Sequence, residues 1–191
     1  MTNRKAMTYD TLQVVRNMRL NGLFKTRGDG ATEITLLHPI KEDRRSECRK
    51  FVESMANSEL EDTLWESEEI HFLRVLTINN DSQLLFCSNF DGSVETYLAD
   101  FLIHMPDYLD RLWGHCEDYP ESGARDFEAF MEFIIMGYVP CQFFFAAYPD
   151  ATVKQVWRAL DWENKTRDFQ RSLARPTASR KCDDKSSQRA A

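Results

Sequence analysis

The sequence predicts an α+β domain with one antiparallel sheet of four strands, in the order βαββαβ. Three observations predict this class. Residues 70–78 and 83–90 are rich in β-forming residues and flank the polar turn 79–82. Residues 94–113 carry apolar side chains at steps of three and four, as an amphipathic helix does. Shorter segments with the residue patterns of helices and strands alternate before the hairpin and after this helix.

Composition narrows the class of protein. A hydrophobic share of 42% is enough for a packed core, and the mean hydropathy of -0.51 is too polar for a membrane protein. No apolar run approaches the roughly 20 residues of a membrane span, so no membrane segment is predicted. The net charge of -7 disfavours nucleic acid as a partner, because such binding depends on neutralising phosphates.

Cysteine usage and the first residues predict a cytoplasmic protein. The five cysteines are odd in number, far apart and never in a C-x-x-C pair. This pattern disfavours a disulfide framework and a structural zinc site, so no metal is predicted and the thiols are expected to be reduced. The first residues lack the apolar stretch of a secretory signal.

Three regions are predicted along the chain. Residues 1–30 form an N-terminal helical extension, with apolar positions between 9 and 20 spaced for a short helix. Residues 31–173 form the α+β domain. Residues 174–191 lack apolar periodicity, with five basic residues against two acidic ones, and are predicted to be a disordered tail.

The first half of the domain begins with a strand over 32–40, ended by Pro39. A charged helix over 41–56 follows, and 57–69 are expected to be an acidic connection without regular structure. The hairpin 70–90 comes next. Asn and Asp in its turn tolerate the positive φ that tight hairpins need.

The second half begins with the amphipathic helix, which Pro106 should kink or split. A further helix is predicted over 127–138, and the apolar stretch 141–149 is expected to be the last strand. Its aromatic side chains are expected in the core, or else they line a pocket for a hydrophobic molecule together with Ala146 and Ala147. Residues 152–173 close the domain as a helix, with Thr152 and Gln155 forming a reciprocal cap.

The order βαββαβ is that of the ferredoxin-like split βαβ unit, with additional N- and C-terminal helices. The helices lie on one face, so a second protomer, the additional helices or a ligand must cover the other. Residues 32–160 resemble the dimeric α/β-barrel superfamily, in particular an uncharacterised branch loosely associated with haem peroxidases. The resemblance rests on His71, Phe72, Arg74, Ser88, Asn89, Phe90, Asp91 and Gly92. It implies a homodimer, in a superfamily that includes monooxygenases, cyclases, haem-handling enzymes and ligand-binding regulators.

The hairpin supplies the first candidate site. With a turn centred on residues 80 and 81, Phe72 lies opposite Asn89, and one sheet face carries Phe72, Arg74, Asn89 and Asp91. His71 then falls on the other face. An arginine within an apolar strand needs an anion. Either Asp91 provides it, or the arginine lies at the sheet edge, or Arg74 and Asn89 orient a ligand's anionic or carbonyl group.

Other candidates each have a structural alternative. Either Asp91 or Ser93 caps the following helix, with Gly92 in the turn, or the free amides at the start of that helix hold an anion. His104 follows Asp100 by four residues and is either a base oriented by a carboxylate or part of a surface pair. His115 either contacts a ligand or favours the negative end of the preceding helix.

The leading hypothesis is an enzyme of oxygenase, peroxidase-associated or cyclase type that acts on a small hydrophobic molecule in specialised or lipid metabolism. Arg74, Asn89, His71 and His104 are its predicted catalytic residues, and Phe72, Asp91, Gly92 and His115 its ligand-binding residues. The alternatives are a non-catalytic module that binds a ligand or protein, and a haem-binding protein with His71, His104 or His115 as the axial ligand. No nucleotide-binding, serine-hydrolase or zinc-protease motif occurs in the sequence.

Overall fold

The computed structural model describes residues 26–27, 31–56 and 59–174. The predicted helix between residues 9 and 20 and the tail from 175 onward lie outside this part. The described elements are β1 (Thr26–Arg27), β2 (Ala31–Pro39), η1 (Glu42–Arg44), α2 (Arg45–Ser54), α3 (Glu59–Ser67), β3 (Ile70–Ile78), β4 (Gln83–Asp91), α4 (Val94–His104), α5 (Pro106–Trp113), α6 (Phe127–Gly137) and α7 (Val153–Ala174).

The sheet confirms the α+β class and consists of three long strands and the two-residue β1. The strand order is β1-β2-β4-β3, and every neighbouring pair is antiparallel. β2 and β3 both run opposite to β4, which lies between them. They are therefore parallel to each other and separated by one strand, as in a split βαβ unit.

The β3–β4 hairpin has the predicted register. Phe72 lies opposite Asn89, Arg74 lies opposite Cys87, and Ile78 faces Gln83 across the turn. The turn residues 79–81 all have positive φ, between 53° and 60°, which Asn and Asp adopt more readily than most residues. One irregularity was not predicted: the register shifts between Ile70 and Phe72, which places a β-bulge at residue 71.

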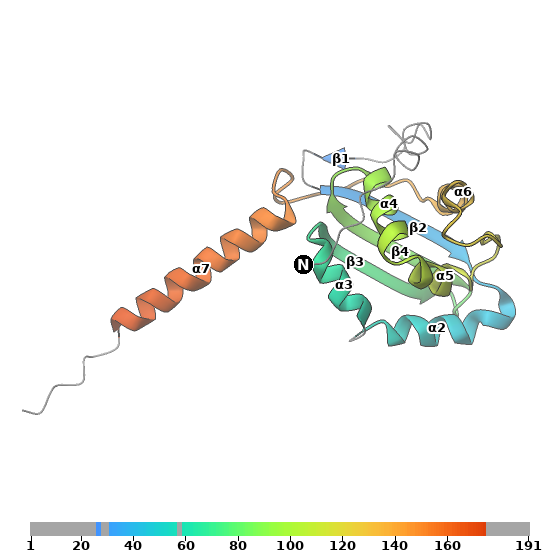
Figure 1. Cartoon of the computed structure of the whole chain (residues 1–191), viewed down its shortest axis with the longest axis horizontal. Coiled ribbons are helices and arrows are strands. Elements are labelled where there is room, and N and C mark those ends of the chain that lie inside the picture. Colours follow the sequence, from blue (N-terminus) through green and yellow to red (C-terminus); the bar gives the residue numbers. More distant parts are fainter. Residues whose placement is uncertain (1–25, 28–30, 57–58, 175–191) are drawn as a thin grey trace, which may run out of the picture. The chain divides into compact units, whose positions relative to one another are not determined.

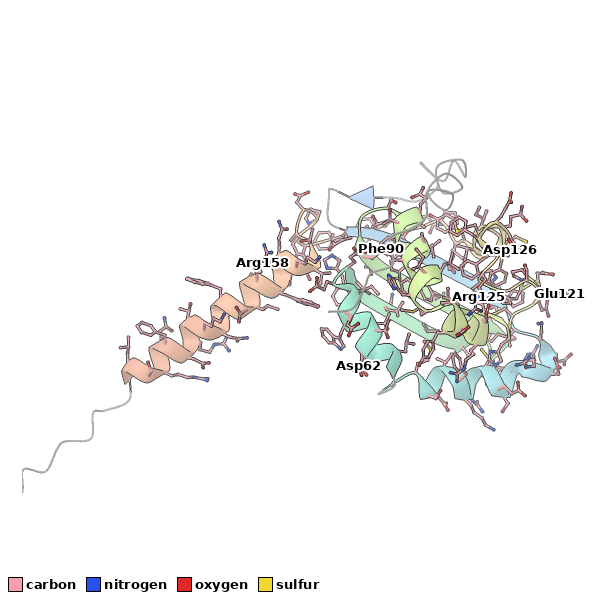
Figure 2. All side chains as sticks on the ribbon, viewed as in Figure 1. Asp62, Phe90, Glu121, Arg125, Asp126 and Arg158 are labelled. Carbon is pink, nitrogen blue, oxygen red and sulfur yellow. The ribbon has the colours of Figure 1, made fainter. Side chains whose placement is uncertain are left out.

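The helices cover one face of the sheet, here called the core face. Alternate β4 residues from Leu84 to Phe90 point into it and are buried. Phe90 stacks on Tyr97 of α4 with 3.7 Å between the ring centroids, and the ring centroid of Phe86 lies 5.7 Å from that of Trp113 of α5. α4 and α5 accordingly lie across the strands in Figure 1, and Figure 2 labels Phe90 where β4 meets α4.

A histidine lies within the core face. His38 of β2 is 3% exposed. Its ring centroid lies 3.9 Å from that of Phe133 and 5.1 Å from that of Trp113. Burial lowers its pKa to about 4, so the imidazole is neutral. α6 approaches this ring at Gly137, where an added Cβ would lie 1.9 Å from His38 Nε2. The absence of a side chain at residue 137 is thus what allows α6 to pack against the imidazole.

The prediction that residues 141–149 form the last strand is wrong, because this segment has no regular secondary structure. The segment contacts β2 instead at two places: Tyr138 bridges Leu36, and the Ala31 amide donates to Pro149 O. Between these points the segment advances eleven residue positions while β2 advances five, so a one-to-one ladder cannot form. Phe143 and Phe145 were expected in the core, but their exposed fractions are 80% and 70%.

Local signals decide several other elements. Pro106 splits the long amphipathic helix as predicted and becomes the first residue of α5. The Thr152–Gln155 cap is also confirmed: Gln155 Oε1 accepts from the Thr152 amide at 2.9 Å, and Thr152 Oγ1 accepts from the Gln155 amide at 3.3 Å. The expected irregular connection 57–69 is wrong in part, because α3 forms over Glu59–Ser67. Its Glu and Leu residues favour helix without a strong periodic pattern.

The chain divides into two units between Val156 and Trp157. The first contains the sheet and its helices. In the second, α7 continues to Ala174 with ion pairs between Lys165 and Asp161 at 2.6 Å and between Arg167 and Glu163 at 2.5 Å. Trp162 and Phe169 are exposed on it. None of the described helices is both long and apolar enough to cross a membrane.

Candidate functional site

The face of the sheet opposite the helices, here called the second face, carries a hollow of about 260 Å³. On β4 this face consists of the alternate residues from Leu85 to Asp91, which are half-buried. The irregular segment 144–148 forms one wall, and sheet residues form the other. The hollow is lined by Ala31, His71, Phe72, Asn89, Phe144, Phe145, Ala146, Ala147 and Tyr148.

A histidine–carboxylate pair lies at this hollow. His71 Nε2 is 2.9 Å from Asp91 Oδ1, and the two side chains are only 7% and 13% exposed. A carboxylate only accepts, so neutral His71 carries its proton on Nε2 and leaves Nδ1 as the basic nitrogen. Its ring centroid is 6.4 Å from that of Tyr148.

The prediction that His71 faces away from Asp91 is wrong. Strict alternation would place residue 71 on the face opposite to Phe72. The bulge between Ile70 and Phe72 adds one residue to β3 and redirects the histidine toward Asp91. Phe72, Asn89 and Asp91 share the second face as predicted, so the structure brings four of the predicted site residues together.

Asp91 also holds a second element. Its Oδ2 accepts the backbone N–H of Val153 at 2.8 Å, at the first residue of α7. Of the two predicted caps for the nearer helix, Ser93 rather than Asp91 caps α4, by accepting from the Thr96 amide at 3.2 Å. Gly92 between them has φ of +86° and serves the predicted turn. One carboxylate thus fixes both the imidazole and the chain that follows the hollow.

Asn89 supplies a neutral polar group to the apolar wall. It lies opposite Phe72 on β3 and opposite Glu33 on β2. Glu33 is 4% exposed, and its Oε2 accepts from Thr35 Oγ1 at 3.3 Å. The strand-to-helix junction does not require an amide at residue 89, which leaves Asn89 as a group that can contact a ligand.

Arg74 lies on the same face but does not line the hollow. The side chain is exposed, and within the described residues it forms no ion pair. The alternative in which Asp91 neutralises a buried Arg74 is wrong, because Asp91 binds His71 and the Val153 amide instead. A role for Arg74 in orienting a ligand stays a prediction.

The remaining predicted residues lie elsewhere. His104, the last residue of α4, is exposed, as in the surface alternative. His115 is 7% exposed, with Nδ1 3.2 Å from Leu112 O, and it lines a second hollow. Burial raises the pKa of neighbouring Cys116 to about 12, so its thiol is not activated.

Of the two interpretations of the stretch 143–148, the structure favours pocket lining over core packing, because Ala146 and Ala147 line the hollow together with Phe144, Phe145 and Tyr148. The two prolines at 140 and 149, which cannot donate to a ladder, were the available signal that this stretch is not a regular strand.

The histidines do not fit haem. The hollow at His71 is smaller than the roughly 300–1,000 Å³ usual for ligand sites, and haem would need the upper part of that range. The other two candidates are the exposed His104 and the buried His115. Among the described residues, no group of three His, Cys, Asp or Glu side chains is placed to hold a metal ion.

Comparisons with protein-family models, curated proteins and solved structures found no match to this chain.

Proposed function

We propose that this protein is an enzyme that binds a small hydrophobic molecule with a carbonyl group and moves a proton on it, as in a cyclase-type reaction. One observation carries the proposal: a largely buried His71–Asp91 pair, 2.9 Å apart, lies at an apolar hollow that also contains Asn89. Histidine is the side chain most often used for general acid–base catalysis, and a carboxylate partner fixes the orientation of the imidazole.

The chemistry follows from the charges. Nδ1 of His71 takes a proton from the carbon next to the carbonyl, and the electron pair moves onto the carbonyl oxygen. The Asp91 carboxylate stabilises the resulting imidazolium. The Asn89 amide donates to the developing oxyanion.

Proton transfer is favoured over the other reactions expected from the resemblance. The site offers a base and an amide donor, which is what a cyclase-type step needs. A non-catalytic ligand-binding module is the second candidate, favoured by the apolar lining alone.

The oligomeric state and the finer fold belong to the same proposal. A cytoplasmic homodimer would cover Phe72 and Leu76 of the second face, whose exposed fractions are 62% and 40%. The order β2–β4–β3 supports the ferredoxin-like arrangement, with segment 138–149 in place of the fourth strand. Sedimentation velocity would measure the dimer, and a Phe72→Glu variant should shift it to monomer.

A blocking variant tests whether the hollow binds ligand. Ala146 lines it, so Ala146→Trp should fill it. Titration of the ¹⁵N-labelled protein with acetophenone, an apolar ketone, should shift the amide signals of 144–148 and the side-chain amide of Asn89. Those shifts should vanish in Ala146→Trp and persist in Ala159→Trp, a control on exposed α7. Equal shifts in both variants would contradict binding in this hollow.

A further inference from the structure

The structure assigns a second binding site to the hollow of about 350 Å³ where η1, α2 and α5 meet. We propose that it binds the phosphate group of a small molecule. No residue that lines it also lines the hollow of the second face, so this inference is independent of the proposed function. It is lined by Arg44, Phe51, Asp110, Arg111, Gly114 and His115.

Two aromatic rings restrain Arg111. Its guanidinium carbon lies 4.8 Å from the ring centroid of Phe51 and 5.6 Å from that of Tyr108. Within the described residues, no carboxylate forms an ion pair with it. Stacking restrains a guanidinium but leaves its N–H groups available, and a planar fork of this kind matches the oxygens of phosphate.

Two further cations lie at the same hollow. Arg44 pairs through Nε with Glu47, at 2.5 Å. Lys41 Nζ donates to the carbonyl oxygen of Gly114 at 3.2 Å, which places an ammonium beside a lining residue. Three cations therefore lie here against two carboxylates, Glu47 and Asp110, in a chain whose net charge is -7.

Asp110, the acidic residue of the lining, already accepts hydrogen bonds from the protein and lies near an arginine. Asp110 Oδ1 accepts from the Tyr119 hydroxyl at 2.6 Å and from the Ala124 amide at 2.7 Å, and Oδ2 is 3.7 Å from Arg125 Nη1. Figure 2 labels Arg125 beside α5. These three donors offset the charge of Asp110, so it opposes a bound anion less than a free carboxylate would.

His115 adds a polar group to the same wall. It is 7% exposed, its ring centroid is 5.9 Å from that of Phe51, and Nδ1 is 3.2 Å from Leu112 O. Because a carbonyl only accepts, Nδ1 carries the hydrogen and Nε2 remains the acceptor. A singly protonated phosphate has a hydroxyl for such an acceptor as well as oxygens for the arginines, whereas an ionised carboxylate has only the oxygens. This difference favours phosphate.

Calorimetric titration with inorganic phosphate tests the site, with sodium chloride at equal ionic strength as the reference. Arg111→Gln and Arg44→Gln should each weaken phosphate binding about tenfold or more, as expected for the loss of charge-assisted hydrogen bonds. Arg49→Gln is the matched control. It removes the same charge from α2, but Arg49 pairs with Asp81 at 2.9 Å and does not line the hollow. Circular dichroism would verify that each variant is folded, and Arg111→Lys should recover part of the affinity.

Three results would overturn the assignment: no phosphate binding beyond that of chloride, an equal loss in Arg49→Gln, or acetate binding as tightly as phosphate. None of them would affect the acetophenone experiment, which reports on the other hollow.

Discussion

The two faces of the sheet each contain a nearly buried histidine, in opposite surroundings. On the core face, His38 lies among the rings of Phe133 and Trp113, and burial lowers its pKa to about 4. At the second face, His71 contacts the carboxylate of Asp91 beside a hollow. Burial alone therefore does not identify a functional histidine. A charged partner and adjoining space for a ligand distinguish His71 from a histidine that only packs.

The largest expected effect is the pH dependence caused by His38. Its folded-state pKa of about 4 lies below the ordinary 6.5 of the unfolded chain. As the pH falls from 6.5 toward 4, the unfolded chain binds a proton that the folded protein does not, so stability is lost. The full difference is about 3 kcal/mol. Urea unfolding of the wild type and of His38→Leu across this range should show that much more loss in the wild type. If both proteins lose the same unfolding free energy over this pH range, the pKa of His38 does not change on folding.

The next effect tests how closely the core face is packed. Gly137→Ala should cost about 2 kcal/mol of unfolding free energy, because the new Cβ would meet the His38 ring at 1.9 Å. Chemical denaturation would measure this loss. Glu132→Ala, an exposed change on the same helix α6, is the control and should be nearly neutral. If both variants are equally stable, the contact between α6 and His38 is looser than described.

A smaller effect is expected for the carboxylate of the second face. Asp91→Ala removes the acceptor for both His71 and the Val153 amide and should cost about 1.5 kcal/mol. Asp91→Asn retains an oxygen acceptor and should lose less. Thermal unfolding of the two variants would rank them, and an equal loss in both would mean that the charge rather than the acceptor stabilises this junction.

The smallest effect is expected for Arg74. Because the side chain is exposed and outside the hollow, Arg74→Ala should change the unfolding free energy by no more than about 0.5 kcal/mol. Denaturant titration would measure it. If the variant fails to fold, Arg74 is a buried, paired charge that the fold requires, and the second face is not a surface open to a ligand.

The hairpin and its site could be predicted because their signals are local. Turn residues that tolerate positive φ fixed the pairing of Phe72 with Asn89, and alternation then placed Asp91 on the same face. Neither the bulge at His71 nor the bond from Asp91 to Val153 could be predicted. The bulge is an insertion that alternation does not reveal, and the bond joins residues 62 positions apart.

The structure of the segment 141–149 could not be predicted from local signals. Its apolar composition predicts a buried strand, but strand formation also requires a one-to-one match with β2 and donors along that edge. The segment is too long between its contacts with β2 at Tyr138 and at Pro149, so the aromatic side chains turn outward or line the hollow. Burial by tertiary contacts, rather than propensity, decides such a stretch.

Deuterium exchange tests the central claim most directly, that His71 moves a proton at the hollow of the second face. Acetophenone in D₂O would be incubated with the wild type, with His71→Gln and with His104→Gln as an exposed-histidine control, and ¹H NMR would follow loss of the α-proton signal. We expect the wild type and His104→Gln to accelerate exchange, and His71→Gln to lose at least a hundredfold of that acceleration. Equal exchange in the wild type and His71→Gln would contradict the account.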